Sequence, residues 1–212
     1  MKFKNIFENM ELKPVVGYVG RFQPFHKNHY DTYMGLVEKY GSDNVYILTS
    51  DKTEKKKSPF NFEDKVKVMN MFGIPKDKII QNKIPYIPLE FLNGNKIPGD
   101  MPFIAAVGEK DSERLKHFVD YEGPVEGTLT GWKDNVHERA KIHAYYEVTP
   151  MMTTKFDNEV ISGTTVRDIF KGNDKDKQKE LFKVLYNKYD KNMFDFIKGK
   201  IWNLLKIPDI SL

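Results

Sequence analysis

Short apolar runs alternate along this chain with segments of helical periodicity. Runs of strand length stand at residues 14–20, 45–48 and 103–107, and such runs are typical of strands buried on both faces of a parallel sheet. Apolar residues recur at helical spacing over residues 30–41 and again over residues 62–73. The alternation predicts an α/β fold, with a Rossmann-like, doubly wound parallel sheet and helices on both of its faces.

The rest of the chain extends this pattern. A third strand is expected within residues 78–87, a helix near Leu115 and a last strand around residues 143–148. Four prolines and two glycines between residues 85 and 102 predict a surface excursion. After Ile161 the apolar residues follow a helical period, which predicts C-terminal helices.

This organisation predicts two regions and one place for a ligand. We expect an α/β domain over residues 1–170 and a C-terminal helical extension over residues 171–212 that packs on the same domain. In open parallel sheets, ligands bind beyond the carboxyl ends of the strands. Functional residues are therefore expected in the connections that follow the strands.

The composition excludes several classes of function. The 212 residues include no cysteine, which excludes disulfides, thiol catalysis and thiolate zinc sites. The 34 Lys and Arg and 30 Asp and Glu are interspersed, and no RNP string is present, so we expect no nucleic-acid partner. No stretch reaches the roughly 18 apolar residues of a membrane span, and the charged N-terminus does not resemble a signal peptide. We expect a soluble, cytoplasmic protein without a membrane partner.

The first motif lies between the first strand and its helix. Residues 20–29 read Gly-Arg-Phe-Gln-Pro-Phe-His-Lys-Asn-His. Gly20 permits a tight turn, Pro24 stiffens it, and His26 and His29 come at the start of the helix, where free amides favour an anion. Two histidines at this spacing can also be capping residues or part of a metal site.

The second motif is Ile-Ser-Gly-Thr-Thr-Val-Arg over residues 161–167. Ser162 and Thr164 offer hydroxyls and amides at the start of a helix, and Arg167 in its first turn offers a planar fork of donors. Together these groups suit the β- and γ-phosphates of a nucleotide. An ordinary capped helix with a surface arginine is the alternative.

The two motifs together resemble those of the nucleotidylyltransferase superfamily. The first resembles the longer form GRFQPxHxGH of nicotinamide-mononucleotide adenylyltransferases of the archaeal and bifunctional bacterial types, with Asn28 where the family usually has glycine. The second resembles the motif ISxTxxR. Viral relatives carry similar strings. Residues 57–69 and 107–111 are similar to two further family segments, of which the second lies near the nucleotide.

The resemblance implies a role for each matching residue. It implies that His26, His29 and Arg167 are catalytic. The nucleotide-binding residues that it implies are Gly20, Arg21, Phe22, Gln23, Gly108, Asp111, Ser162, Thr164 and Thr165. Arg21 and Trp132 are candidates for binding the acceptor, Arg21 through its phosphate and Trp132 by stacking on a flat base. The lysines of residues 52–57 are candidates for covering the triphosphate, although a solvated charge run is the ordinary explanation of such a loop.

The reaction implied by the resemblance joins a nucleotide to a phosphorylated acceptor. A substrate phosphate attacks the α-phosphorus of ATP or CTP in line, and pyrophosphate leaves. Mg²⁺, carried by the triphosphate and not by protein ligands, neutralises charge. The first motif favours ATP and nicotinamide mononucleotide, which give NAD. Phosphopantetheine, glycerol phosphate and choline phosphate are alternative acceptors, a non-catalytic nucleotide-binding module is the alternative from another class, and a homo-oligomer is compatible with the sequence.

Overall fold

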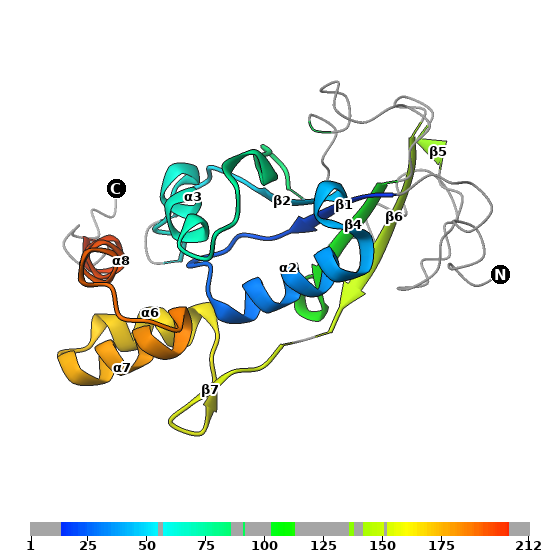
Figure 1. Cartoon of the computed structure of the whole chain (residues 1–212). Helices are drawn as coiled ribbons and strands as arrows, with labels where there is room; N and C mark the ends of the chain where they lie inside the picture. Colours follow the sequence, from blue (N-terminus) through cyan, green and yellow to red (C-terminus); the bar gives the residue numbers. More distant parts are fainter. Residues whose placement is uncertain are drawn as a thin grey trace. The chain divides into compact units, whose positions relative to one another are not determined.

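The computed structural model describes residues 14–54, 57–85, 91, 103–112, 136–137, 142–150 and 152–203 of the chain. These residues separate into two compact units (Figure 1). The sheet unit comprises the described residues of Met1–Gly20, Thr32–Ser50 and Asp77–Met151, and the helical unit those of Arg21–Asp31, Asp51–Lys76 and Met152–Leu212. The division at residue 170 stays a prediction. The expected helix near Leu115, most of the excursion over residues 85–102, and Trp132 lie outside the described residues.

The sheet unit is built on one mixed sheet of six strands. Their order is β3-β2-β1-β4-β6-β5, where the strands are β1 Val15–Val19, β2 Val45–Thr49, β3 Ile79–Gln81, β4 Phe103–Gly108, β5 Val136–His137 and β6 Ile142–Thr149. Five strands are parallel, and β5 pairs with β6 in the antiparallel sense. The chain builds outward from β1 to β3 and then reverses to place β4 on the other side of β1, so the predicted doubly wound sheet is confirmed.

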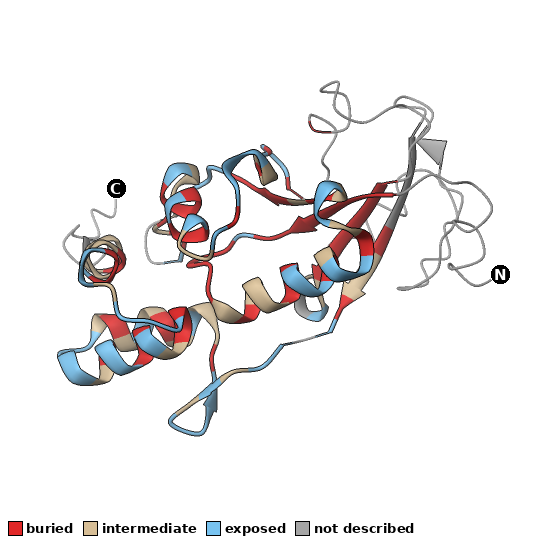
Figure 2. Ribbon diagram, viewed as in Figure 1, coloured by how far each residue is buried: buried red, intermediate tan, exposed pale blue. Residues whose placement is uncertain are grey.

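The central strand β1 is buried along its whole length (Figure 2). On one face, Val15 and Val19 join a cluster that includes Leu48 and Phe103. Gly17 lies between these two large side chains: a Cβ atom there would come within 2.6 Å of Leu48 Cδ1 and 2.9 Å of Phe103 Cζ. A residue without a side chain is therefore required at the centre of this face.

Helices connect the parallel strands, as the periodicity predicted. Helix α2, Lys27–Tyr40, lies between β1 and β2, and α3, Phe62–Asn70, lies between β2 and β3. Gly41 ends the first helix with a φ of 88°, a backbone conformation that glycine adopts at little cost. Within the sheet unit, Lys39 and Tyr40 of this helix both bind the carboxylate of Glu147 on β6.

Two elements differ in extent from the sequence prediction. Helix α2 begins at Lys27, three residues earlier than the apolar period beginning at Tyr30 indicated. Of the stretch 78–87, the structure describes residues 78–85, and among these the third strand occupies three, Ile79–Gln81. Just after it, the backbone amide of Asn82 still donates to the carbonyl of Thr49 at 2.9 Å, while the side chain of Asn82 donates to the carbonyl of Ile84.

The helical unit contains a hairpin followed by three helices. The hairpin pairs β7, Lys155–Phe156, with β8, Glu159–Val160, and precedes α6, Gly163–Lys171, α7, Lys175–Tyr186, and α8, Lys191–Asn203. The hairpin was not part of the sequence prediction, whereas the helices were. Gln178, fully buried on α7, donates to carbonyls at the end of α6 and accepts from Lys198 of α8. The side-chain amide of this α7 residue thus links α7 to both α6 and α8.

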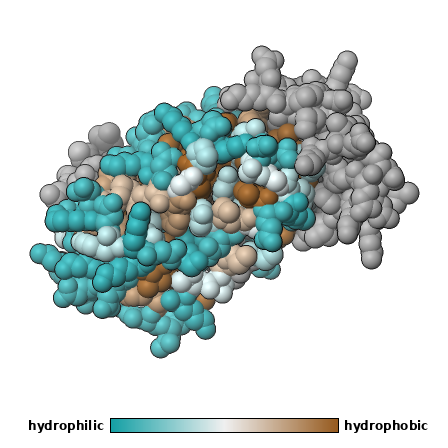
Figure 3. Space-filling view, viewed as in Figure 1, coloured by the Kyte–Doolittle hydropathy of each residue, from teal (hydrophilic) through white to brown (hydrophobic). Residues whose placement is uncertain are grey.

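The surface of the described residues is largely polar. In the coloured part of Figure 3, hydrophilic side chains cover much of the face, with apolar ones between them. The large apolar residues that are exposed among the described residues are Met34, Ile84, Met152, Val160 and Tyr189. Among the described helices, none combines the length and the apolar character needed to cross a membrane.

Candidate active site

The loop that follows β1 is held in place by its own residues. Gln23 is buried, and its side-chain amide makes two hydrogen bonds to the backbone of Phe60: Nε2 donates to the carbonyl at 2.8 Å, and Oε1 accepts from the amide at 2.9 Å. The peptide bond from Gln23 to Pro24 is cis, and Phe22 has a φ of 47°, an uncommon conformation for a bulky residue. The side chain of Gln23, predicted to bind nucleotide, is thus engaged within the protein.

The two histidines at the start of α2 lie against each other. His26 is 3% exposed, and the centroids of its ring and that of His29 are 4.0 Å apart. The backbone amide of His26 donates to Nδ1 of His29 at 3.3 Å. Since Nδ1 accepts, the proton of a neutral His29 is on Nε2. Nδ1 of His26 has no hydrogen-bond partner among the described residues.

Both imidazoles are electrically neutral at pH 7. Burial lowers the pKa of His26 well below its ordinary value of 6.5, and the nearby His29 lowers it further. Burial also lowers the pKa of His29, to about 4. The pair therefore offers ring nitrogens as hydrogen-bonding groups and brings no fixed positive charge.

The second motif starts helix α6 and contacts the loop of residues 20–26, called the histidine loop below. Ser162 caps the helix, its Oγ accepting from the amide of Thr165 at 3.1 Å. Arg167 donates from Nη2 to Oγ1 of Thr164 at 3.1 Å and from Nη1 to the carbonyl of Gln23 at 2.6 Å. Arg167 is the fifth residue of α6 and so lies in its second turn, where the sequence analysis expected the first. The structure brings the two motifs together at Gln23.

The glycine of the second motif permits this contact. A Cβ atom on Gly163 would lie 3.0 Å from the carbonyl oxygen of Gln23 and 3.2 Å from Nη1 of Arg167. Both distances are tighter than ordinary van der Waals contact. The absence of a side chain therefore lets the start of α6 approach the loop.

A buried lysine adds to the positive charge near the loop. Lys65 on α3 is 1% exposed. Burial and, to a smaller extent, the charge of Arg21 lower its pKa to about 8, against the opposing effect of Asp51 and Asp64. Burial and Arg21 likewise lower the pKa of Arg167. Arg21 is thus close enough to act on two other cations, and a cluster of like charges is favourable where it meets an anion.

Lys65 was not among the site residues expected from the sequence. Its position gave a signal, because it falls on the apolar stripe that Phe62, Val66 and Met69 form on α3. A lysine at such a position can also extend its amine into water. Only the packing decides between the two.

Asn28, which stands where the family usually has glycine, bonds to a distant segment. Its Oδ1 accepts from the hydroxyl of Thr154, and the carbonyl of Thr154 accepts from the amide of Ile161 at 2.9 Å. Asn28 therefore connects the start of α2 with the segment that leads into the second motif.

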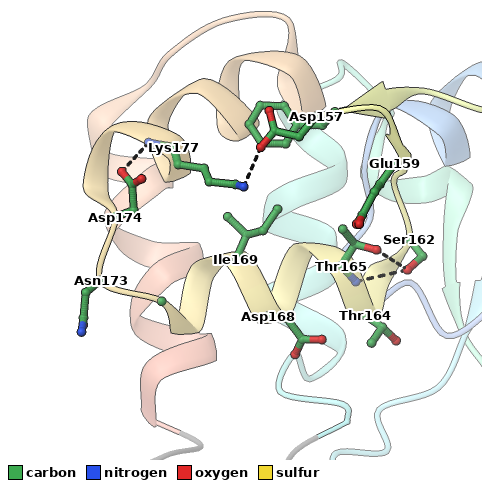
Figure 4. Close-up of a pocket in the computed structure, with 12 residues that line it drawn as sticks. Asp157, Glu159, Ser162, Thr164, Thr165, Asp168, Ile169, Asn173, Asp174 and Lys177 are labelled. Carbon is green, nitrogen blue, oxygen red and sulfur yellow. Dashed lines mark hydrogen bonds and ion pairs between the residues drawn. The ribbon is translucent and has the colours of Figure 1, made fainter.

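A pocket of about 480 Å³ adjoins α6 (Figure 4). Ser162, Thr164 and Thr165 line one end of it, and the rest of its lining comes from the hairpin and the start of α7. Four carboxylates line it, those of Asp157, Glu159, Asp168 and Asp174, and one cation, Lys177, which pairs with Asp157. Because carboxylates repel phosphates, we do not place a polyphosphate in this pocket.

The remaining candidates are divided between the units. Gly20, Gly108 and Asp111 belong to the sheet unit: the amide of Gly20 donates to the carbonyl of Leu48, Gly108 ends β4, and Asp111 ends a short 3₁₀ helix, Glu109–Asp111. Arg21 is exposed in the helical unit.

The lysine-rich loop is only partly described. Lys52 and Lys57 are exposed, and Lys52 pairs with Glu54 at 3.3 Å, while residues 55 and 56 lie outside the described residues. The roles of all these candidates stay predictions.

Two solved structures share the fold over most of this chain. Both are crystal structures of a bifunctional NMN adenylyltransferase/ADP ribose pyrophosphatase from Francisella tularensis, one of them complexed with AMP and a manganese ion. Each is 14% identical with a TM-score of 0.50, and they cover 91% and 92% of this chain. This chain covers 52% of theirs, about half their length.

Comparison with curated proteins found no match to the sequence. A family model described as cytidylyltransferase-like matches residues 17–169. That match spans more than half of the chain and includes the histidine loop and the start of α6, which the structure joins through Arg167. The chain therefore belongs to the cytidylyltransferase-like family of nucleotidylyltransferases.

Proposed function

We propose that the protein transfers the adenylyl group of ATP to nicotinamide mononucleotide and releases pyrophosphate and NAD. One observation carries the proposal: two neutral imidazoles in contact lie at the start of α2, directly after the loop in which the carbonyl of Gln23 binds Arg167. Donors and a cation from segments far apart in sequence thus meet at one loop. Such a set of groups suits a polyphosphate whose charge rises in the transition state.

The chemistry needs positioning and charge stabilisation more than a strong base. The attacking group is a phosphate oxygen of the acceptor, which is already a nucleophile, and it displaces pyrophosphate from the α-phosphorus. His29 donates from Nε2 to an oxygen of the transferring or leaving phosphate. His26, with an unpartnered Nδ1, provides a second imidazole at the same place.

The cationic side chains hold the leaving pyrophosphate. Arg167 supplies a guanidinium, and Lys65 with Arg21 extends the positive field. Among the described residues, no group of three or more His, Asp or Glu side chains is arranged to hold a metal ion. Mg²⁺ would be carried by the triphosphate oxygens, whose charge it would neutralise.

A substrate panel tests the reaction and the acceptor together. ATP and CTP are each incubated with Mg²⁺ and nicotinamide mononucleotide, phosphopantetheine, glycerol phosphate or choline phosphate, and pyrophosphate release is measured. We expect turnover with ATP and nicotinamide mononucleotide, with NAD as the product. Turnover only with CTP and an alcohol phosphate would assign the chain to cytidylyl transfer, and the adenylyl proposal would be wrong.

A non-catalytic nucleotide-binding module is the second candidate. Asn28 favours it, because a buried side chain stands where the family usually has glycine at the start of α2. This candidate predicts nucleotide binding without pyrophosphate release for every acceptor. Equilibrium binding of ATP, measured on the same preparation as the panel, distinguishes such a module from an inactive protein.

A further inference from the structure

The peptide group between Phe25 and His26 is bonded on both sides. Its carbonyl, on Phe25, accepts a hydrogen bond from the hydroxyl of Tyr186 at 3.0 Å. Its amide, on His26, donates to Nδ1 of His29 at 3.3 Å. Because a peptide group is planar, the orientation of one bond fixes that of the other. The last residue of α7 is thus connected with an imidazole of the candidate site.

The carbonyl of Phe25 depends on this tyrosine. The first helical bond of α2 runs from the amide of Tyr30 to the carbonyl of His26, so the carbonyl of Phe25 lies outside the helical ladder. A buried carbonyl without a partner is unfavourable. Tyr186 is itself buried, and burial raises the pKa of its hydroxyl, so the hydroxyl keeps its proton and remains a donor.

The ring of Tyr186 supports the same imidazole through packing. Ring centroids lie 5.6 Å apart between Tyr186 and Phe72, 5.5 Å between Phe72 and Phe25, and 5.5 Å between Phe25 and His29. The hydroxyl and the ring of Tyr186 therefore reach His29 by two separate routes.

We propose that Tyr186 is a positioning residue for His29: by holding the 25–26 peptide plane, it keeps the imidazole in the tautomer whose Nε2 carries the proton. A hydrogen bond to the carbonyl also polarises the peptide and strengthens its amide as a donor. The use of that Nε2 proton on a phosphate rests on the proposed function. The tautomer itself does not, so the two can be tested apart.

The direct test is the tautomer of His29 in the variant Tyr186→Phe. The variant keeps the ring that packs on Phe72 and removes only the hydroxyl. Long-range ¹H–¹⁵N correlation spectra of the labelled full chain at pH 7 report which ring nitrogen is protonated, and His29→Gln assigns the signals. We expect Nδ1 of His29 to be unprotonated in the unmodified protein, and the two tautomers to be mixed in Tyr186→Phe.

Two further variants separate positioning from stability. Phe182→Leu disturbs the packing of α7 beside Tyr186, whose ring centroid is 4.7 Å away, but keeps the hydroxyl. Tyr189→Phe removes the hydroxyl of a tyrosine that is 40% exposed. Both should leave the tautomer of His29 unchanged. A protonated Nδ1 in the unmodified protein, or the same tautomer in Tyr186→Phe, would overturn the proposal.

Kinetics with whichever substrate pair the panel identifies give an independent reading. Tyr186→Phe should lower kcat about tenfold and change the KM for nucleotide less than twofold, because the donor matters most as charge develops. An equal loss of kcat in Phe182→Leu would mean that the tyrosine acts only through stability. If no acceptor is turned over, the proposed function fails while the tautomer measurement still decides the role of Tyr186.

Discussion

At the scale of single residues, the imidazole pair is the first part of the site to test. Replacing either His26 or His29 by alanine removes a preorganised donor from the phosphates. We expect kcat to fall about 100-fold in each variant, as for the loss of one donor to a developing charge, with nucleotide affinity changed far less. Pyrophosphate release at saturating substrate measures kcat, and equilibrium binding measures the nucleotide affinity. Unchanged kcat in both variants would remove the histidines from the mechanism.

The buried imidazoles also make stability depend on pH. The folded protein holds the pKa of His29 at about 4, below the ordinary 6.5, so between these values the unfolded chain binds more protons than the folded one. Stability should therefore fall as the pH is lowered from 6.5 towards 4. The free energy of unfolding, measured with urea, should fall between pH 7 and pH 4.5. This fall should be about 2 kcal/mol smaller in His29→Gln than in the unmodified protein. Equal losses in the two proteins would contradict this assignment.

If Lys65 contributes to the proposed nucleotide site, nucleotide affinity should depend on pH above pH 7. Its pKa of about 8 means that it is charged at pH 7 and largely neutral at pH 9, so affinity for a polyphosphate should fall as the pH rises through 8. A bound anion favours the charged form, so binding raises this pKa.

Two variants of Lys65 serve as a matched pair for this prediction. Lys65→Arg stays charged at both pH values and should bind with an affinity that no longer depends on pH in this range. Lys65→Gln should bind ATP about tenfold more weakly than the unmodified protein at pH 7. Its affinity should also not depend on pH in this range. Isothermal titration with ATP at pH 7 and pH 9 measures all three proteins. If the affinity of Lys65→Arg still fell between pH 7 and pH 9, the pH dependence would belong to another group.

At the scale of elements, the start of α6 is fitted to the histidine loop. In Gly163→Ala the new Cβ atom meets the carbonyl of Gln23 and Nη1 of Arg167, so one of them must move. We expect kcat to fall at least tenfold and the free energy of unfolding to fall by about 1 kcal/mol.

Gly35 provides the control for this substitution. It is exposed within α2, and nothing lies within 4 Å of a Cβ atom added there. Gly35→Ala should raise the free energy of unfolding by up to about 1 kcal/mol and leave kcat unchanged. If Gly163→Ala also left kcat unchanged, the close approach of α6 to the loop would not be needed for activity.

At the scale of the whole molecule, ligand binding should appear as added stability. A nucleotide at 100 times its Kd stabilises the folded state by about 2.7 kcal/mol, which for a chain of this size is a rise in Tm of about 5–10 °C. Arg167→Lys should show a much smaller rise, since one amine cannot replace a guanidinium that bonds to both Gln23 and Thr164. Thermal scans with and without ATP measure this, and an undiminished rise in the variant would place Arg167 outside the nucleotide site.

The sequence by itself determined the sheet and the two motifs. Apolar runs of strand length and helical periods are local patterns, so the parallel strands around β1 and the helices between them could be read from neighbouring residues. The histidine loop and the Ser-Gly-Thr-Thr helix start are likewise contiguous strings. The length of β3, three residues, was harder, because a short strand has too few residues to show a periodic pattern.

Only the tertiary structure decided which distant residues meet. Arg167 bonds to the carbonyl of Gln23 across 144 positions of the chain, and Tyr186 to that of Phe25 across 161. Neither acceptor has a sequence signature, because every residue has a carbonyl and packing alone selects which one is left without a partner. The burial of Lys65 was decided in the same way, since a lysine on an apolar stripe looks the same in the sequence whether its amine reaches water or the protein interior.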